Sequence, residues 1–229
     1  MNEFIDLKNI WSNYGEDDVY WSVLTSPEYK REVITKETIK QFFESAECNI
    51  QTLESISNEH GVSLIDKNIL DFGCGVGRLS LSLAPYCNHV TGIDIFQGHI
   101  NTANHHKHEF EIHNVDFFLS QIEIRSFGTF EAIVSLIVLQ HNRPTLMKSY
   151  IKQLLQMLNE NDFSLLHIPY SIPNYKPNLN LIYGMEMHYL NLEDIQTLAY
   201  KCNCIVHKHD VDMCGGNIKN AIFFFQKLV

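Results

Sequence analysis

The sequence has little proline and glycine and no long apolar run, and these shortages exclude several classes of protein. Among 229 residues there are 6 prolines and 11 glycines, too few for a collagen-like chain or a flexible linker. The longest apolar runs without a charge, residues 132–140 and 163–175, fall short of the roughly 18 residues that a membrane helix requires. We therefore expect a globular protein with no membrane span.

Basic residues and paired cysteines are also scarce. The chain holds 17 Lys and Arg against 27 Asp and Glu, and its net charge of −10 repels nucleic-acid phosphates and anionic lipids, so neither is expected as a partner. The first six residues lack the basic and apolar segments of a signal peptide, which predicts a cytoplasmic location. The six cysteines match no C-x-x-C metal framework, and we expect free thiols.

From residue 68 onward, short β-rich runs alternate with helical patterns. This alternation predicts an α/β fold in which helices cover a doubly wound, mostly parallel sheet. Strands are expected at 68–72, 89–95, 112–118, 130–137 and 163–168, with two more at 204–211 and 220–226. Helices are expected between them at 77–86, 97–108 and 144–158, and a further one from Asn191. We interpret residues 1–229 as a single domain.

Two segments lie outside this alternation. Residues 1–66 are expected to form a helical extension, because Ser26 and Pro27 resemble a helix start and Gly61 a helix end, with Phe42 and Phe43 docking it on the core. Residues 170–189 form a loop-like insert after the fifth strand. The aromatic residues of both segments suggest ligand walls or ordinary packing: Trp11, Tyr14, Tyr20 and Trp21, and Tyr170, Tyr175, Tyr183 and Tyr189.

A glycine-rich turn follows the first strand, at Gly73-Cys74-Gly75-Val76-Gly77. Such a turn lets a ligand approach the backbone closely. Its G-x-G-x-G spacing differs from the dinucleotide G-x-G-x-x-G, and it lacks the Lys-Ser/Thr ending of a P-loop. Phosphate binding is therefore disfavoured.

Three acids are spaced almost evenly around this turn. Asp71 precedes Gly73 by two residues, Asp94 follows it by 21, and Asp116 follows Asp94 by 22. If each acid ends a strand, all three lie at the carboxyl edge of the sheet, where open α/β sheets bind ligands and where Asp94 can reach both hydroxyls of a ribose. Each acid alone is explained by solvation or helix capping, and a buried Asp71 needs a cationic partner. Together with the glycine turn they predict a ligand site.

These residues resemble the class I S-adenosylmethionine-dependent methyltransferases, above all in Leu70-Asp71-Phe72-Gly73-Cys74-Gly75-Val76-Gly77. The resemblance implies a seven-stranded Rossmann-like sheet, with five parallel strands and a C-terminal antiparallel hairpin. It further implies a core at 67–229, with residues 1–66 as a helical extension and lid and 170–189 as a substrate-side insert. S-adenosylmethionine would be the cofactor and S-adenosylhomocysteine the product.

The resemblance also implies roles for individual residues. Asp71 would support the cofactor's amino group, Asp94 would hold the ribose hydroxyls, Asp116 would bind the adenine amino group and the Phe117 N–H would bind its ring. Gly73, Cys74 and Gly75 would pack against the methionine portion. Further expected cofactor contacts are Ile95, Leu136, Trp21 and Arg78, although Arg78 is equally typical of a surface residue.

The expected methyl acceptor is a small molecule. The segment after the fourth strand reads Leu136-Ile137-Val138-Leu139, without the Asn/Asp-Pro-Pro-aromatic signature of amino-methylating DNA enzymes, and no cysteine follows a proline. The closest resemblance is to bacterial small-metabolite methyltransferases. We expect a metabolite or sugar-like hydroxyl as acceptor. A small amine, or a partner subunit that binds the cofactor without catalysis, remains an alternative.

Histidines supply the candidate base. A neutral hydroxyl acceptor needs a proton acceptor, and His141 follows the fourth strand, near the expected methyl position; a structural histidine is the competing interpretation. His105, His106, His108 and His113 crowd one region, but no cysteine or carboxylate stands at a convincing ligand spacing. No metal site is expected.

Overall fold

The computed structural model describes residues 2–176, 186–215 and 217–229. It forms two compact units, the N-terminal unit Leu7–Gln121 and the C-terminal unit, which joins Ile122–Val229 to the first six residues. The strand order is β3-β2-β1-β4-β5-β7-β6, which confirms the predicted seven-stranded α/β fold.

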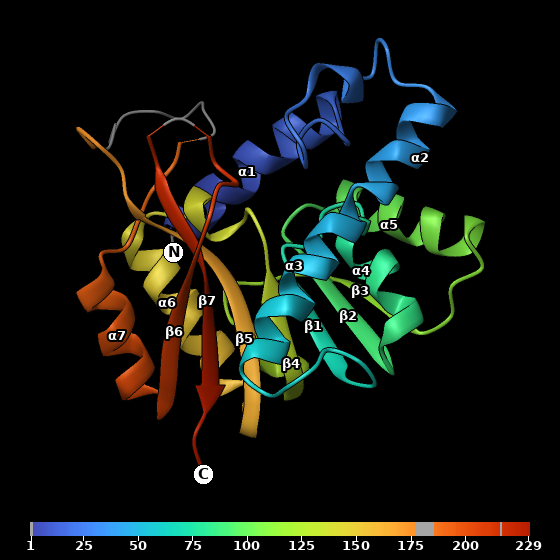
Figure 1. Ribbon diagram of the computed structural model, residues 1–229. Coiled ribbons are helices and arrows are strands. Elements are labelled where there is room, and N and C mark those ends of the chain that lie inside the picture. Colours follow the sequence, from blue (N-terminus) through green and yellow to red (C-terminus); the bar gives the residue numbers. More distant parts are fainter. Residues whose placement is uncertain (1, 177–185, 216) are drawn as a thin grey trace. The chain divides into compact units, whose positions relative to one another are not determined.

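The N-terminal unit holds three parallel strands, which run side by side in Figure 1. Helix α1 covers Asn2–Asp17, and the elements after it are η1 Pro27–Tyr29, α2 Lys36–Glu44, α3 Ala46–Glu59, β1 Asn68–Phe72, α4 Arg78–Leu83, η2 Ala84–Tyr86, β2 His89–Asp94, α5 Gln97–Glu109 and β3 Val115–Leu119. The strand expected at 112–118 therefore begins three residues later than the pattern predicted.

The helical extension docks as its sequence predicts. Thr35 caps α2, since its hydroxyl accepts from the backbone N–H of Thr38. Phe42 and Phe43 are buried, and their edge-to-face rings lie 5.4 Å apart. The helix expected from Pro27 is only a single 3₁₀ turn, because the backbone returns to an extended conformation at Lys30.

The C-terminal unit contains the remaining strands. Its elements are η3 Arg125–Phe127, β4 Phe130–Ser135, η4 Leu139–His141, α6 Pro144–Gln156, β5 Leu158–Ser171, α7 Leu192–Lys201, β6 Cys204–Val211 and β7 Lys219–Lys227. β4 pairs with β5 in parallel, and β7 pairs antiparallel with both β5 and β6, which confirms the predicted C-terminal hairpin. Asn191 caps α7 through the N–H of Asp194.

All six cysteines are free thiols. Among the described residues, no helix combines the length and the apolar character that crossing a membrane would need. Of the expected insert 170–189, residues 177–185, and with them Tyr183, lie outside the described part of the chain.

Candidate functional site

The glycine turn is held by its own backbone. Gly73, Gly75 and Gly77 have φ values of +79°, +55° and +84°, in the left-handed region that favours glycine. The N–H groups of Gly73 and Cys74 both donate to Ile93 O, at 2.8 and 3.1 Å, and that of Gly77 donates to Cys74 O. Because these amides are engaged inside the protein, they do not form the open N–H nest that binds a phosphate.

Val23, in the N-terminal extension, lies directly on this turn. A Cβ added to Gly75 would stand 2.7 Å from Val23 Cγ2, closer than real Cβ contacts allow. A glycine is therefore required at position 75, because of the positive φ angle and because Val23 leaves no room for a side chain. Val23 of the N-terminal extension therefore contacts the glycine turn.

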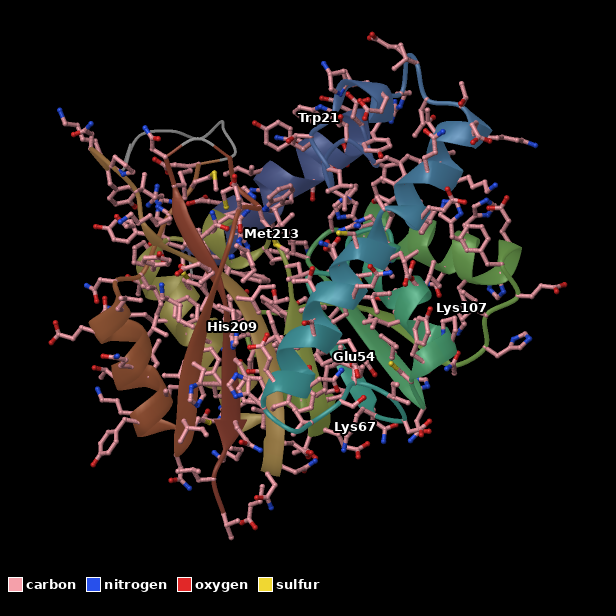
Figure 2. All side chains as sticks on the ribbon, viewed as in Figure 1. Trp21, Glu54, Lys67, Lys107, His209 and Met213 are labelled. Carbon is pink, nitrogen blue, oxygen red and sulfur yellow. The ribbon has the colours of Figure 1, made fainter. Side chains whose placement is uncertain are left out.

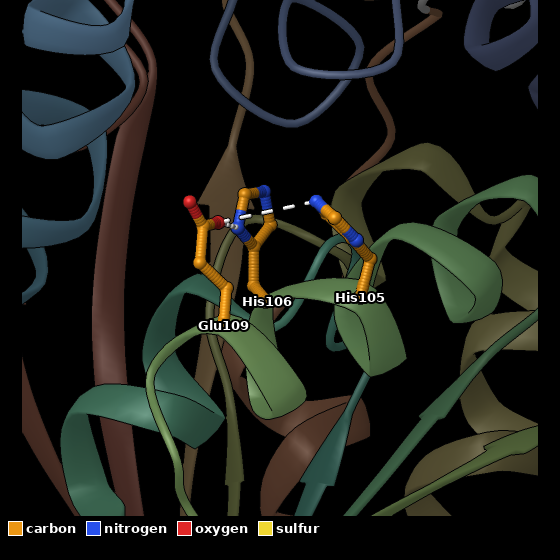
Figure 3. A group of neighbouring side chains, drawn as sticks. All are labelled: His105, His106 and Glu109. Carbon is orange, nitrogen blue, oxygen red and sulfur yellow. Dashed lines mark hydrogen bonds and ion pairs between the residues drawn. The ribbon is translucent and has the colours of Figure 1, made fainter.

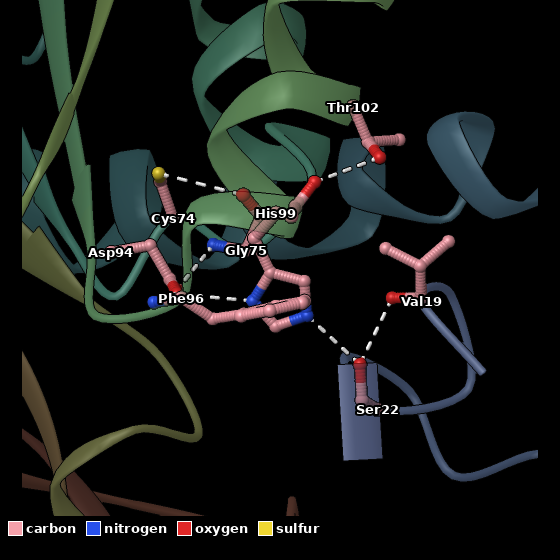
Figure 4. A network of polar contacts seen from close by, with 9 residues as sticks. Val19, Ser22, Cys74, Gly75, Asp94, Phe96, His99 and Thr102 are labelled. Carbon is pink, nitrogen blue, oxygen red and sulfur yellow. Dashed lines mark hydrogen bonds and ion pairs between the residues drawn. The ribbon is translucent and has the colours of Figure 1, made fainter. Parts of the chain in front are cut away.

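Asp94 is the centre of a buried hydrogen-bond network, drawn in Figure 4. It ends β2 and is 8% exposed. Its Oδ2 accepts from the N–H of Gly75 at 3.0 Å, and its Oδ1 accepts from the N–H of Phe96 at 2.9 Å. The ring of His99, on α5, adds a contact of 3.0 Å between Nδ1 and Oδ1.

The network extends from His99 to the N-terminal extension. His99 Nε2 lies 2.8 Å from the hydroxyl of Ser22, which is buried and also within 3.0 Å of Val19 O. The hydroxyl has one hydrogen, so it donates either to Val19 O or to the imidazole. A continuous polar chain thus joins the extension to the strand-end carboxylate.

This environment keeps Asp94 ionised. Burial by itself raises the pKa of Asp94, but His99 and the N–H groups of Phe96 and Gly75 outweigh it, so the pKa lies below its ordinary value. A charged carboxylate at the carboxyl end of β2 is the state needed to accept hydrogen bonds from ligand hydroxyls.

Asp71 is a second buried carboxylate beside the turn, and its surroundings disfavour the charged form. Burial raises its pKa to about 6, and the charge of Asp94 adds to this, while the Ser80 hydroxyl and Arg78 oppose it. Ser80 Oγ donates to Asp71 Oδ2 at 2.6 Å. The cation that the sequence led us to expect acts on Asp71 through its charge, whereas the direct hydrogen bond comes from a neutral hydroxyl.

Arg78 has a structural task. The side chain is buried, and its guanidinium donates to Ser45 Oγ at 3.1 Å and to Asn49 Oδ1 at 2.9 Å. Burial lowers its pKa from the ordinary value. Arg78 is therefore not a surface residue, and it fastens the start of α4 to α3; the predicted cofactor contact has no support from this geometry.

Asp116 does not end its strand, which corrects the expectation from sequence. It is the second residue of β3 and pairs in register with Thr91, whereas the partner of Asp94 is Leu119. Three residues of strand, roughly 10 Å, separate Asp116 from the carboxyl edge. Its carboxylate binds Lys107 Nζ at 2.9 Å, and His89 Nε2 lies 3.4 Å away.

Phe117 also lies inside the strand, opposite Gly92. Its ring fills the space above two glycines, since an added Cβ would meet that ring at 2.6 Å from Gly92 and at 2.8 Å from Gly77. This packing and the mid-strand position give no support to the predicted backbone contact of Phe117 with a ligand at the strand end.

The residues that do follow β3 are Ser120 and Gln121, which were not among the site residues predicted from the sequence. The backbone N–H of Ser120 donates to Asp94 O at 2.7 Å, so the chain turns away at the same level as the end of β2. Ser120 is buried and Gln121 is exposed. The pairing of Asp94 with Leu119 identifies them as the residues at the strand end, but this register cannot be read from the sequence.

The remaining predicted cofactor contacts of the N-terminal unit, Cys74, Ile95 and Trp21, differ in their burial. Cys74 is buried, and burial raises the pKa of its thiol well above the ordinary value, while Ile95 is partly exposed directly after β2. Trp21, labelled in Figure 2, is half-buried, with Lys30 Nζ 5.5 Å from its ring centre and the Tyr14 ring 6.1 Å away. Tyr20 packs edge-on against Phe42, which is the ordinary packing alternative.

In the C-terminal unit, His141 lies in η4 among other histidines. Its Nδ1 is 3.3 Å from Glu186 O, a contact that favours the tautomer with the proton on Nδ1. Burial lowers the pKa of His141 to about 4, against the opposing Glu186 contact, and His188 and His167 lower it further. His141 is therefore a neutral imidazole at pH 7.

Leu136, another predicted cofactor contact, is half-buried and comes directly after β4.

Several buried polar atoms of this unit have no hydrogen-bond partner among the described residues. They are Gln140 Oε1, Asn142 Oδ1, Ser164 Oγ and His167 Nδ1. A buried acceptor without a donor is unfavourable by about 1–3 kcal/mol, so such atoms are uncommon unless a ligand or water completes them. Gln140 and Asn142 flank His141 in the chain, so this stretch holds two of the four buried polar atoms that lack a partner among the described residues.

Comparisons with known proteins agree with the fold. Residues 69–161 match the family described as a methyltransferase domain. A ubiquinone biosynthesis O-methyltransferase of Coxiella burnetii is 33% identical over 85 residues, 36% of this chain and 36% of that protein. The protein of the same name from Aromatoleum aromaticum is 32% identical over 108 residues, 46% of this chain and 45% of that protein. The match therefore spans less than half the length of these curated relatives.

Solved structures extend the likeness in fold. The magnesium protoporphyrin IX methyltransferase of Synechocystis PCC 6803, solved with bound S-adenosylhomocysteine, has a TM-score of 0.70 at 15% identity, over 96% of this chain and 98% of that one. An S-adenosylmethionine-dependent methyltransferase from Methanosarcina mazei has a TM-score of 0.59 at 20% identity, over 74% of this chain and 96% of that one. Residues 69–161 thus match a methyltransferase domain, and the chain shares the fold of these S-adenosylmethionine-dependent methyltransferases.

Proposed function

We propose that this protein binds S-adenosylmethionine at the glycine turn and transfers its methyl group to the hydroxyl of a small molecule. The observation that carries the proposal is the pair of buried carboxylates, Asp71 and Asp94, beside a turn whose amides are already engaged. A buried acidic site of this kind disfavours phosphates and suits a ligand with an ammonium group, a sulfonium and a ribose.

Asp94 is the proposed ribose ligand. A carboxylate has about four lone-pair positions, and Gly75, Phe96 and His99 occupy three of them. One hydroxyl can add to Oδ2 at once. A second hydroxyl requires one existing contact to give way, and the His99 side chain is the partner that can turn, because the other two donors belong to fixed backbone.

Asp71 is the proposed partner of the ammonium group. A buried carboxyl group with a raised pKa gains a counter-ion when a cationic ligand arrives, which converts an unfavourable charge into a favourable pair. Gly73, Cys74 and Gly75 would face the methionine portion. For the adenine we propose Ser120 and Gln121 in place of Asp116, since they follow β3 at the level where β2 ends.

The acceptor side is proposed for the C-terminal unit. Bound S-adenosylmethionine would supply an electrophilic methyl carbon. His141 would take the proton of the acceptor hydroxyl on Nε2 as the new C–O bond forms and the C–S bond breaks. Gln140, Asn142 and His167 offer buried acceptor atoms to further hydroxyl or N–H groups of the substrate. The O-methyltransferase activity named for the curated relatives supports oxygen as the acceptor atom.

Cofactor binding is tested by calorimetry with S-adenosylhomocysteine. Asp94→Ala should lose about 2–3 kcal/mol, or roughly 30- to 150-fold in affinity, because it removes the charged acceptor of the ribose. Asp116→Ala is the matched control and should bind within about twofold of wild type, as it lies away from the strand ends. Equal losses in both variants, with unchanged melting temperatures, would contradict the assignment.

Methyl transfer is tested separately by following S-adenosylhomocysteine release with a panel of phenols, aliphatic alcohols and amines. Release with hydroxyl acceptors supports the proposal, and release only with amines would redirect it to nitrogen. Tight cofactor binding without release on any acceptor would favour a non-catalytic partner subunit instead.

A further inference from the structure

A cluster of possible metal ligands lies on α5, at a place that the methyltransferase site does not use. It consists of His105, His106 and Glu109, whose nearest ligand atoms all lie within 4.8 Å of one another. Figure 3 shows the three side chains converging above the helix. We refer to them as the α5 cluster. It lies eight or more residues from the start of α5 at Gln97, about 12 Å along the helix axis.

The two contacts of the Glu109 carboxylate define the geometry. Oε2 lies 2.9 Å from His106 Nδ1 and 4.0 Å from His105 Nε2. Two metal–ligand bonds of about 2.0–2.1 Å at a tetrahedral centre separate their ligand atoms by roughly 3.3 Å. The first pair is already near this separation, and the second needs a small rotation of His105 and Glu109, both of which are exposed.

His106 is the fixed member of the cluster. Its side chain is 3% exposed and packs between the rings of Phe43 and Phe110, at 4.8 and 5.3 Å. One buried ligand with two exposed ones is an arrangement that can close around an ion.

A second residue orients this imidazole from the far side. The hydroxyl of Tyr20 lies 2.6 Å from His106 Nε2. A ligating histidine ordinarily donates its other ring N–H to an oxygen, and the Tyr20 hydroxyl can accept that hydrogen bond. Without a metal, Nδ1–H donates to the Glu109 carboxylate, so ligation through Nδ1 requires the ring proton to be on Nε2, facing the Tyr20 hydroxyl. The spacing of a sequence motif did not reveal this support, because Tyr20 is 86 residues away.

We propose that the α5 cluster binds one divalent transition-metal ion of the Zn²⁺ type, through His105 Nε2, His106 Nδ1 and Glu109 Oε2, with water as the fourth ligand. Two imidazoles and a carboxylate suit Zn²⁺ rather than Mg²⁺ or Ca²⁺, which prefer all-oxygen sites. The acidic chain, with a net charge of −10, favours cation binding in general. The site is independent of the proposed methyl transfer, and it revises the expectation from sequence that no carboxylate stands at a convincing ligand spacing and that no metal binds.

The test is titration of the tag-free protein with Zn²⁺ by calorimetry, alongside thermal melting. Wild type should bind one Zn²⁺ and melt at a higher temperature in its presence. His105→Ala and Glu109→Gln change exposed residues and should each weaken binding at least about tenfold, since each loses a ligand. His108→Ala, exposed on the same helix, is the matched control and should bind as wild type does.

Tyr20→Phe separates a built site from an exposed pair of side chains. It removes the oxygen that orients His106 and should weaken Zn²⁺ binding by about 10- to 100-fold, while His105 and Glu109 remain in place. The proposal is overturned if wild type binds no Zn²⁺ at one equivalent, or if His105→Ala and His108→Ala lower the affinity equally. Because S-adenosylhomocysteine is absent from this titration, its outcome does not depend on the proposed function.

Discussion

The Nδ1 atom of His99 lies 3.0 Å from Oδ1 of Asp94, so a residue of α5 holds the carboxylate that ends β2. The contact is almost closed to solvent, with side-chain exposures of 4% and 10%. The same imidazole reaches Ser22 in the N-terminal extension. The state of the strand-end carboxylate is thereby linked to the segment that covers the glycine turn.

Removing His99 should make cofactor binding depend on pH. Without the imidazole, burial of Asp94 acts with less opposition, so its pKa rises and the carboxylate becomes protonated at a higher pH. We expect His99→Ala to lose affinity for S-adenosylhomocysteine several-fold more between pH 8 and pH 5.5 than wild type does. Calorimetry at four pH values measures this. Ser22→Ala, which leaves the His99–Asp94 contact intact, should follow the wild-type profile, and identical profiles for all three proteins would rule out the positioning role.

Asp71→Asn should stabilise the fold and weaken the cofactor complex. A carboxyl group whose pKa is raised to about 6 in the folded state stabilises the fold below its unfolded value of 3.8, and this contribution is lost as the pH rises through 6. Asn avoids the buried charge, so the variant should be more stable than wild type by up to about 3 kcal/mol at pH 7 and by little at pH 4.

Urea unfolding at both pH values tests the stability part, and calorimetry with S-adenosylhomocysteine tests the affinity part. Ser80→Ala is the control, because it leaves the charge buried without its hydrogen-bond donor and should destabilise the protein at pH 7. An Asp71→Asn protein that is more stable and binds the cofactor as tightly as wild type would exclude Asp71 from the site.

If His141 is the general base, turnover should persist in mildly acidic solution. Burial lowers its pKa to about 4 from an ordinary 6.5, so the imidazole stays neutral, and able to accept a proton, down to about pH 4. His141→Gln should reduce kcat by about 10²- to 10⁴-fold with little change in cofactor affinity.

The same shift has a consequence for stability. A histidine with a depressed pKa stabilises the fold above about pH 6.5, and that contribution is lost as the pH falls towards 4. His141→Gln should therefore flatten the loss of stability in this window. A variant with normal kcat and a lower Tm would show a purely structural histidine.

Gly75→Ala should lower the free energy of unfolding more than a Gly→Ala change at another glycine with positive φ whose surroundings are open. Gly61 has φ +73° and no atom within 4 Å of an added Cβ, so Gly61→Ala isolates the backbone strain, about 1 kcal/mol. Gly75→Ala adds the collision with Val23 and should cost roughly 1–3 kcal/mol more.

Val23→Ala in the Gly75→Ala background should recover part of that difference, as measured by urea unfolding. Equal losses at Gly61 and Gly75, or no recovery in the double variant, would show that Val23 does not press on the turn.

The sequence determined the elements and the features that depend on neighbours in the chain. β1 and β6 have the predicted bounds, and for β1 an apolar run with turn residues at its ends specifies a buried strand locally. The glycine turn and Asp94 were found for the same reason. The left-handed backbone angles of the turn favour glycine, and Asp94 stands at the end of a β-rich run.

Only the tertiary structure decided what depends on strand register and on distant partners. Asp116 has the right spacing in the chain but lies three residues before the end of β3, since pairing with β2 and not sequence separation sets the level of each residue. Arg78, expected either to contact a ligand or to lie on the surface, is buried and donates to Asn49, and Ser22 contacts His99 across 77 residues. The α5 cluster has the same origin, because a buried histidine becomes a candidate ligand only when packing fixes one face of its ring and a distant hydroxyl orients the other.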